Sequence, residues 1–198
     1  MNPLKDKLAR GEVAASMTVR LVSSVEIVRI AKTAGFDAIY IDLEHSAFSI
    51  ETTAQISVMA LEAGIPALVR VPAAEALPKM NEATMVIVQF ESAAALAAVE
   101  EIVAVAGVDL VLIGTNDFLA DLGRPGEYDH PKVHEVYERT LAACRRCGKH
   151  VGVGGLGSRP DLVQKYVAMG ARFVSTGTDL GFLLAACTER AKQVRNLK

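Results

Sequence analysis

Ionisable side chains follow several apolar segments of this sequence, at the point where each segment ends. The clearest example is residues 38–41, which are followed at once by Asp42, Glu44 and His45. A histidine close to a carboxylate has the form of a general base that the carboxylate orients. The same residues could instead only hydrogen-bond to the next loop, so this segment alone leaves both interpretations open.

Two further carboxylates, Glu91 and Asp117, follow the apolar segments 84–90 and 109–113. A pair of carboxylates at neighbouring strand ends suits a hard divalent cation such as Mg²⁺ or Mn²⁺, which keeps several of its waters. Arg70 ends another apolar segment, and its planar guanidinium suits a carboxylate or a developing enolate oxygen. Each residue could instead form a salt bridge or cap a helix, but their recurrence favours one shared site.

The elements that must position these residues are apolar segments of strand length, which alternate with segments of helix length. This alternation without hairpin signals predicts repeated βαβ units and a parallel sheet. In parallel α/β proteins, active sites form at the carboxyl ends of the strands. Seven strands are predicted, beginning near Val13, Ala38, Pro66, Thr84, Asp109, His150 and Arg172.

The connection between the third and fourth predicted strands is unusually short. Residues 73–83 include Pro78 and hardly suffice for a parallel crossover, which needs about a dozen residues. A (β/α)₈ barrel typically has about 250 residues, so a chain of 198 residues is roughly 50 short. We therefore predict an α/β fold, a TIM (β/α)₈ barrel formed by residues 1–198 as a single domain. One βα unit, around strand four, is predicted to be missing between Pro72 and Thr84.

The composition is that of an ordinary globular domain, with 51% hydrophobic and 22% charged residues. The formal net charge is −2 and the basic residues are scattered, so no nucleic-acid partner is expected. No stretch approaches the roughly 18 consecutive apolar residues of a membrane span, and no signal peptide is evident. Three cysteines fit a reducing compartment. We expect a cytoplasmic protein that binds a small molecule.

Residues 152–157 match the pattern G-x-G-x-x-G between a predicted strand and a predicted helix. Such a pattern can bind the pyrophosphate of a dinucleotide. Against this interpretation, it lies near the end of the chain, Pro160 follows at once, and too little sequence remains for a Rossmann half. We therefore expect a tight strand-to-helix turn here.

Four segments, taken in order, resemble the HpcH/HpaI aldolase family. They are residues 34–45, 69–72, 88–92 and 107–117, and the similarity runs from about Val13 to Leu184. These are the class II, metal-dependent pyruvate aldolases that act on 4-hydroxy-2-oxo acids. The combination of segments is far more specific than any one of them.

The resemblance implies a lyase that reversibly cleaves a 4-hydroxy-2-oxo acid to pyruvate and an aldehyde. It implies a divalent cation, Mg²⁺, Mn²⁺ or Co²⁺, bound by Glu91 and Asp117 and chelated by the 2-oxo acid. Further implied roles concern the substrate and its protons: Arg70 contacts the keto oxygen that becomes the enolate, His45 paired with Asp42 acts with a metal-held water as acid/base, Gln89 lines the pyruvate site, and the backbone N–H groups of Gly114 and Thr115 hold the substrate carboxylate.

The sequence departs from the family at two places. Family members usually have Gly-Pro-Ala/Ser-Asp-Leu where this chain has residues 114–118, Gly-Thr-Asn-Asp-Phe, so Asp117 is kept but the carboxylate-binding loop is altered. The missing unit is a region that, in the family, helps to form the subunit interface. The resemblance also implies a homo-oligomer, commonly a hexamer, in which residues 180–194 could exchange between subunits.

Two alternative functions stay open on the sequence. A lyase resembling the citrate lyase β-subunit or malyl-CoA lyase would share the barrel and the metal pair, although it would call for a basic surface that the scattered charges do not favour. A non-catalytic, truncated barrel would bind no metal.

Overall fold

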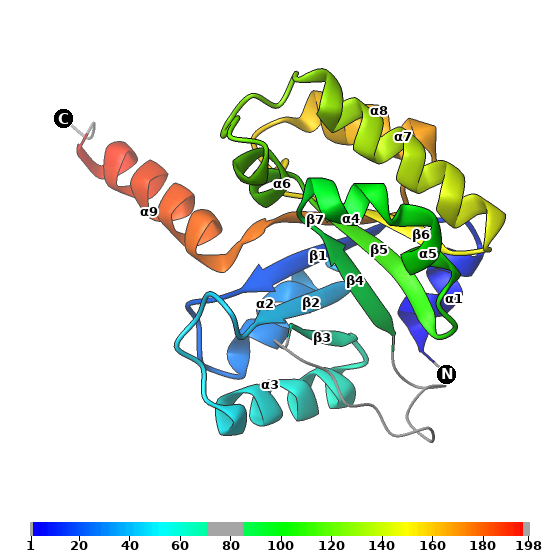
Figure 1. Ribbon diagram of the computed structural model, residues 1–198. Coiled ribbons are helices and arrows are strands. Elements are labelled where there is room, and N and C mark those ends of the chain that lie inside the picture. Colours follow the sequence, from blue (N-terminus) through cyan, green and yellow to red (C-terminus); the bar gives the residue numbers. More distant parts are fainter. Residues whose placement is uncertain (1, 71–84, 196–198) are drawn as a thin grey trace. The chain divides into compact units, whose positions relative to one another are not determined.

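The computed structural model describes residues 2–70 and 85–195, and over these ranges strands alternate with helices (Figure 1). The chain forms two compact units. Unit 1 comprises Met1–Ala15 and Glu75–Thr176, and unit 2 comprises Ser16–Ala74 and Gly177–Lys198. The prediction of a missing βα unit falls on residues 73–83, which lie outside the described residues.

Unit 2 contains three parallel strands in the order β3-β2-β1 and three helices within its described part. Their bounds are β1 (Ala14–Val19), α2 (Glu26–Thr33), β2 (Ala38–Asp42), α3 (Ile50–Ala63), β3 (Ala67–Arg70) and α9 (Asp179–Arg195). The first two residues of β1 belong to unit 1. The unit has its own apolar core, which includes Met17, Val19, Ile27, Val28, Ile39, Ile41 and Ile56.

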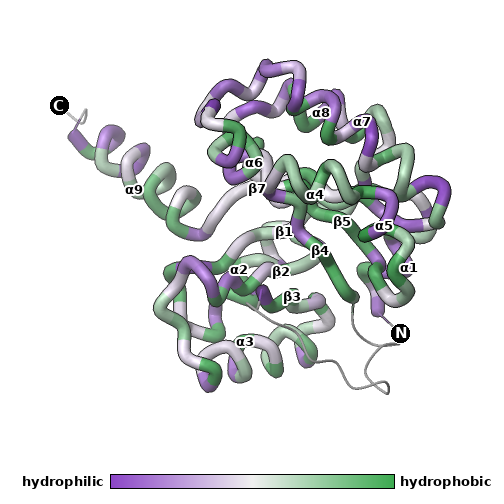
Figure 2. The backbone as a smooth tube through the Cα atoms, in the orientation of Figure 1, coloured by the Kyte–Doolittle hydropathy of each residue, from purple (hydrophilic) through white to green (hydrophobic). Residues whose placement is uncertain are grey.

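Unit 1 contains four parallel strands in the order β7-β6-β5-β4, where the last two residues of β7 belong to unit 2. Helix α7 packs on β5 and β6, and the strands are largely hydrophobic (Figure 2). The bounds of the elements are α1 (Pro3–Ala9), β4 (Val86–Phe90), α4 (Ala93–Ala97), α5 (Val99–Ala104), β5 (Val108–Gly114), α6 (Thr115–Asp121), α7 (Pro131–Arg146), β6 (His150–Gly154), α8 (Pro160–Met169) and β7 (Phe173–Thr178).

The prediction of a parallel α/β fold is confirmed, with one correction at the end of β5. We expected the apolar segment 109–113 to form a strand that ends in residues 114–117, whereas Thr115–Asp121 form helix α6. Phe118 and Leu119 are fully buried in the core of unit 1, and this burial stabilises a helical turn where sequence spacing alone predicted none. Thr115 and Asp117 therefore lie on a short helix.

The glycine-rich residues 152–157 connect β6 to α8, as predicted for a turn. A Cβ atom at Gly152 would lie 2.9 Å from Leu112 Cδ1 and 3.0 Å from Phe173 Cδ1, so the strands leave no room for a side chain. Gly155 adopts a φ of 76°, which favours glycine. Close packing and turn geometry thus account for these glycines.

No helix in residues 2–70 and 85–195 is both long enough and apolar enough to cross a membrane.

We predict that Gly152→Ala destabilises the protein by about 1–3 kcal/mol, because the added methyl group overpacks a filled core. Urea unfolding measures the change in free energy. Gly181→Ala is the control, since Gly181 lies in α9 and its Cβ would meet only Thr178 Oγ1, at 3.4 Å. Equal stability of the two variants would show that Gly152 is not a packing requirement.

Candidate active site

Asp42 ends β2 and is fully buried. Its Oδ1 atom accepts the backbone N–H groups of Glu44 (3.0 Å) and His45 (3.2 Å), which turns the chain back over the carboxylate. This turn places His45 Nδ1 3.1 Å from Asp42 Oδ2. The structure therefore brings together the two residues that the sequence predicted as an acid/base pair.

Arg20, immediately after β1, is a member of this cluster that the sequence analysis missed. Its Nε atom donates to Asp42 Oδ2 at 2.8 Å, and its Nη2 atom lies 2.7 Å from the same oxygen. The available signal was its position, because Arg20 directly follows β1 and Asp42 is the last residue of β2. The salt bridge itself depends on the register of β1 against β2, which pairs Val19 with Ile41.

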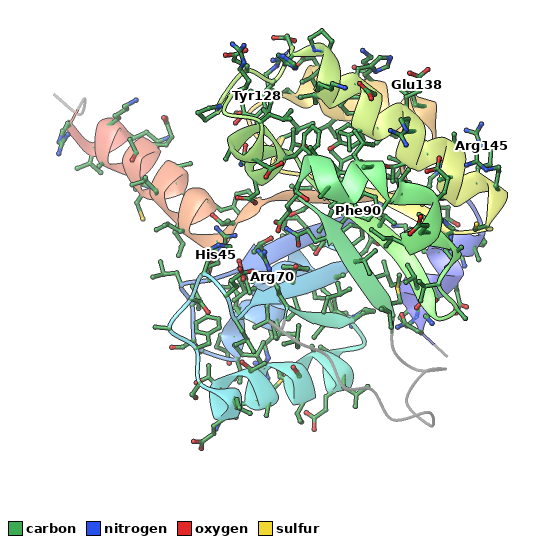
Figure 3. The ribbon with its side chains drawn as sticks, in the orientation of Figure 1. His45, Arg70, Phe90, Tyr128, Glu138 and Arg145 are labelled. Atoms are coloured by element: carbon green, nitrogen blue, oxygen red, sulfur yellow. The ribbon has the colours of Figure 1, made fainter. Side chains whose placement is uncertain are left out.

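Arg70 ends β3, and the strand register pairs it directly with Asp42. Its Nη1 atom lies 3.3 Å from His45 Nδ1 and 4.0 Å from Asp42 Oδ2, and its Nη2 atom forms an ion pair with Glu44. Figure 3 shows His45 and Arg70 next to each other at the carboxyl ends of β2 and β3. A guanidinium beside an imidazole combines a fixed positive charge with a group that can carry a proton.

The carboxylate of Asp42 stays ionised in this setting. Burial raises the pKa of Asp42, but the hydrogen bonds from the ring and backbone of His45 and the charge of Arg20 together outweigh burial. The pKa of Asp42 therefore lies below its ordinary value. An ionised acceptor orients the His45 ring more firmly than a neutral carboxyl group would.

Asp179 fixes the end of β1 from which Arg20 projects. Its buried carboxylate accepts the backbone N–H groups of Arg20 (3.0 Å), Leu21 (2.8 Å) and Val22 (2.8 Å). Because three successive backbone donors share one carboxylate, this loop has little freedom to move. The backbone of Arg20 is therefore held independently of its side chain.

A second group of predicted residues lies in unit 1, around Gly114. Strand register pairs Phe90 with Ile113, so Glu91 follows β4 beside the end of β5, and Gln89 donates a hydrogen bond to Glu91 Oε1. A Cβ atom at Gly114 would lie 2.8 Å from Glu91 Cγ and 3.1 Å from Gln89 Nε2. Both side chains therefore pack directly against the backbone of Gly114, where a larger residue would clash with them.

The residues after Gly114 are held by two tyrosines that the sequence analysis missed. The buried hydroxyl of Thr115 lies 2.9 Å from Tyr137 Oη, and Tyr128 Oη donates to Asn116 Oδ1 at 2.9 Å. Burial raises the pKa of Tyr137, so this tyrosine stays a neutral hydrogen-bonding group. No motif pointed to these tyrosines, because α7 and its preceding loop join this site only in the tertiary fold.

Asp117 lies in the first turn of α6 and is exposed. Over the residues that the structure describes, no group of three or more His, Cys, Asp or Glu side chains could hold a metal ion. Two carboxylates, Glu91 and Asp117, are the donors that the sequence predicted, and an all-oxygen set of this size fits a hard cation that keeps several waters. The donor chemistry therefore fits Mg²⁺ or a similar ion.

The sequence is similar to a known protein family and to several characterised relatives. The family model for HpcH/HpaI aldolase/citrate lyase matches residues 74–186. A 4-hydroxy-4-methyl-2-oxoglutarate aldolase from Chaetomium globosum is 27% identical over 258 residues, covering 99% of this chain and 96% of that protein. A 2-keto-3-deoxy-L-rhamnonate aldolase from Escherichia coli is 26% identical over 255 residues, covering 100% of this chain and 94% of that protein.

Solved structures show the same fold. An HpcH/HpaI aldolase from Desulfitobacterium hafniense aligns with a TM-score of 0.86 at 24% identity, covering 100% of this chain and 98% of that chain. The citrate synthase SbnG aligns with a TM-score of 0.82 at 20% identity and full coverage of both chains. A citrate lyase β subunit from M. tuberculosis aligns less well, with a TM-score of 0.56 at 17% identity, covering 86% of this chain and 92% of that chain.

We predict that Asp42→Asn lowers the free energy of unfolding by about 2–4 kcal/mol at pH 7, because it leaves the Arg20 charge without its buried partner. Since the pKa of Asp42 is lowered in the folded protein, its stabilisation is present above pH 4 and is lost as the pH falls through the folded pKa. Urea unfolding at pH 7, 5 and 3 should therefore show the difference between wild type and variant shrinking at pH 3.

The control for this pH series is Glu62→Gln, which changes an exposed carboxylate of α3 in the same unit. This variant should match the wild type at every pH. A difference for Asp42→Asn that stays constant down to pH 3 would contradict an ionised, charge-paired Asp42.

Proposed function

The chain belongs to the HpcH/HpaI aldolase/citrate lyase family of carbon–carbon lyases, and on this premise we propose that it is a divalent-metal-dependent aldolase. Its reaction is the reversible cleavage of a 4-hydroxy-2-oxo acid to pyruvate and an aldehyde. The observation that carries this proposal is the cluster of Asp42, His45 and Arg70. It supplies an oriented proton acceptor and a fixed positive charge, and a reaction that forms an enolate needs both.

In the cleavage direction, His45 accepts the proton of the 4-hydroxyl group as the bond between C3 and C4 breaks. The electrons of that bond form the enolate of pyruvate, and C4 leaves as the aldehyde. Arg70 stabilises the negative charge that develops on the keto oxygen. Asp42 keeps the His45 ring in place through Nδ1, so that Nε2 can exchange the proton.

Glu91 and Asp117 hold the cation, and Mg²⁺, Mn²⁺ and Co²⁺ all suit their oxygen ligands. When bound, the cation supplies Lewis-acid stabilisation of the keto oxygen. Gln89 lines the pyruvate site, and the backbone N–H groups of Gly114 and Thr115 bind the substrate carboxylate. Two contacts in unit 1 support these roles. Gln89 and Glu91 both pack against Gly114, and the hydroxyl group of Thr115 forms a hydrogen bond with that of Tyr137.

We further propose that residues 1–198 form one TIM-type domain that lacks a βα unit around strand four. The alignment with the Chaetomium globosum relative supports this, because it extends over 258 positions although the chain has only 198 residues. The relative therefore contains residues without a counterpart here. The alternative is a non-catalytic, truncated barrel. The turnover and metal-binding experiments below distinguish it from an aldolase, because it would bind no metal.

Assembly and location follow the same reasoning. Exposed Leu183, Leu184 and Val194 on α9 support a homo-oligomer that covers this helix, and the family resemblance favours a hexamer. The cysteines, all present as thiols, support a cytoplasmic location. A lyase resembling the citrate lyase β-subunit or malyl-CoA lyase is less well supported, because the relatives that align over nearly their full length are named as aldolases.

We predict that Glu91→Ala and Asp117→Ala each reduce metal-dependent turnover by about a thousandfold, because the cation that stabilises the developing enolate charge is bound less well. Pyruvate release from a 4-hydroxy-2-oxo acid, with and without EDTA, measures the loss, and calorimetry with Mn²⁺ measures metal affinity. Glu101→Gln, an exposed position of α5, should behave as the wild type. Normal turnover in either alanine variant would refute the metal assignment.

For His45→Ala we expect turnover to fall about a hundredfold, because a general base is lost, while pyruvate still binds. Turnover is measured at saturating substrate, and pyruvate binding is measured as product inhibition. If the variant instead lost pyruvate binding at unchanged turnover, His45 would be a ligand-binding residue and the acid/base role would be wrong.

A further inference from the structure

Asp42 accepts more donors than its lone pairs accommodate comfortably. Five donor atoms from described residues lie within 3.2 Å of its oxygens: two backbone N–H groups at Oδ1, and Arg20 Nε, Arg20 Nη2 and His45 Nδ1 at Oδ2. A carboxylate offers about four acceptor sites. The guanidinium of Arg20 and the ring of His45 therefore share a single oxygen.

The His45 ring nitrogen that faces this oxygen also faces Arg70. An arginine N–H can only donate, so the 3.3 Å contact of Arg70 Nη1 with His45 Nδ1 is a hydrogen bond only if Nδ1 carries no proton. The contact with Asp42 Oδ2 is a hydrogen bond only if Nδ1 carries one, because Asp42 is ionised. The ionised acceptor makes the stronger bond, which places the proton on Nδ1 and leaves Nε2 as the basic nitrogen.

Charged groups surround the His45 ring and its hydrogen-bonding partners. Within the part of the chain that the structure describes, the charged groups that face the ring and its partners include Arg20 from the end of β1, Asp42 and Glu44 from the end of β2, Arg70 from β3 and Asp179 from the start of α9. The negative charge of Asp42 favours the imidazolium form of the ring. Arg20 contacts the same oxygen of Asp42 and opposes this effect.

We propose that Arg20 is a positioning residue for the acid/base pair: its guanidinium binds Asp42 Oδ2, the oxygen that His45 Nδ1 also contacts, and offsets the charge of that carboxylate, so that His45 is available as an unprotonated base. Arg20 acts through Asp42 and does not need to touch the substrate. The catalytic consequence rests on the proposed function, whereas the effect on the charge of His45 can be measured without any substrate.

The direct test is the ¹⁵N NMR titration of the His45 ring in the wild type and in Arg20→Gln. The chain has four histidines, so His45→Gln serves to assign the signal. In Arg20→Gln we expect the midpoint of the His45 titration to rise by about one pH unit, because a positive charge is removed from the partner of the ring. Above this midpoint the ring should carry its proton on Nδ1 in both proteins.

Three further variants separate charge from shape. Arg20→Lys keeps the charge and should leave the midpoint close to that of the wild type. Arg29→Gln removes an exposed arginine of α2 in the same unit and should change nothing. The Arg20 side chain is 39% exposed and its backbone is held by Asp179, so the glutamine variant should fold; Arg20→Ala replaces it if it does not.

Turnover gives an independent readout. In Arg20→Gln the acidic limb of the kcat/KM profile should shift to higher pH by the same interval, which is about a tenfold loss at a given pH on that limb, with recovery on the alkaline side. A His45 midpoint that is unchanged in Arg20→Gln, or equally shifted in Arg20→Lys, would overturn the proposal. If no aldol cleavage is found but the His45 midpoint shifts as expected, the proposed function fails and the coupling of Arg20 to His45 stands.

Discussion

A buried carboxylate needs hydrogen-bond donors or positive charges around it. In unit 2, the groups that meet this need for Asp42 come from the ends of the strands and from the turn after β2. Removing an ionised group from water costs several kcal/mol unless hydrogen bonds and opposite charges replace the lost hydration. Asp42 obtains them from the turn after β2, from Arg20 at the end of β1 and, at a longer distance, from Arg70 at the end of β3. Each of the strands β1, β2 and β3 thus has, at its carboxyl end, a group that interacts with this one carboxylate.

In unit 1, the side chains of Glu91 and Gln89 lie close against the backbone of Gly114. Any side chain at Gly114 would displace Glu91 and Gln89, so this position requires glycine. The side chains of Thr115 and Asn116 each form a hydrogen bond with a tyrosine. Rigid support of this kind suits groups that must hold a ligand in one geometry. The two units therefore hold their predicted site residues by different means, charge pairing in unit 2 and steric exclusion in unit 1.

The sequence predicted the strands and their polar ends well, because burial on both faces of a parallel strand leaves a long apolar run that stops abruptly. It predicted the pairing of Asp42 with His45 because that pairing is local. Arg20 was missed because its role depends on strand register, and Tyr128 and Tyr137 were missed because they reach the site from a distant helix and its preceding loop. Helix α6 was missed because burial of Phe118 and Leu119, not local spacing, stabilises it.

We propose that this protein forms the enolate of pyruvate with the help of a divalent cation. The most direct measurement is the exchange of the pyruvate methyl protons with D₂O, followed by ¹H NMR, because it needs no knowledge of the aldehyde. We predict that the methyl signal disappears with Mg²⁺ or Mn²⁺, and that EDTA stops the exchange. Exchange no faster than in buffer alone, with metal present, would contradict it.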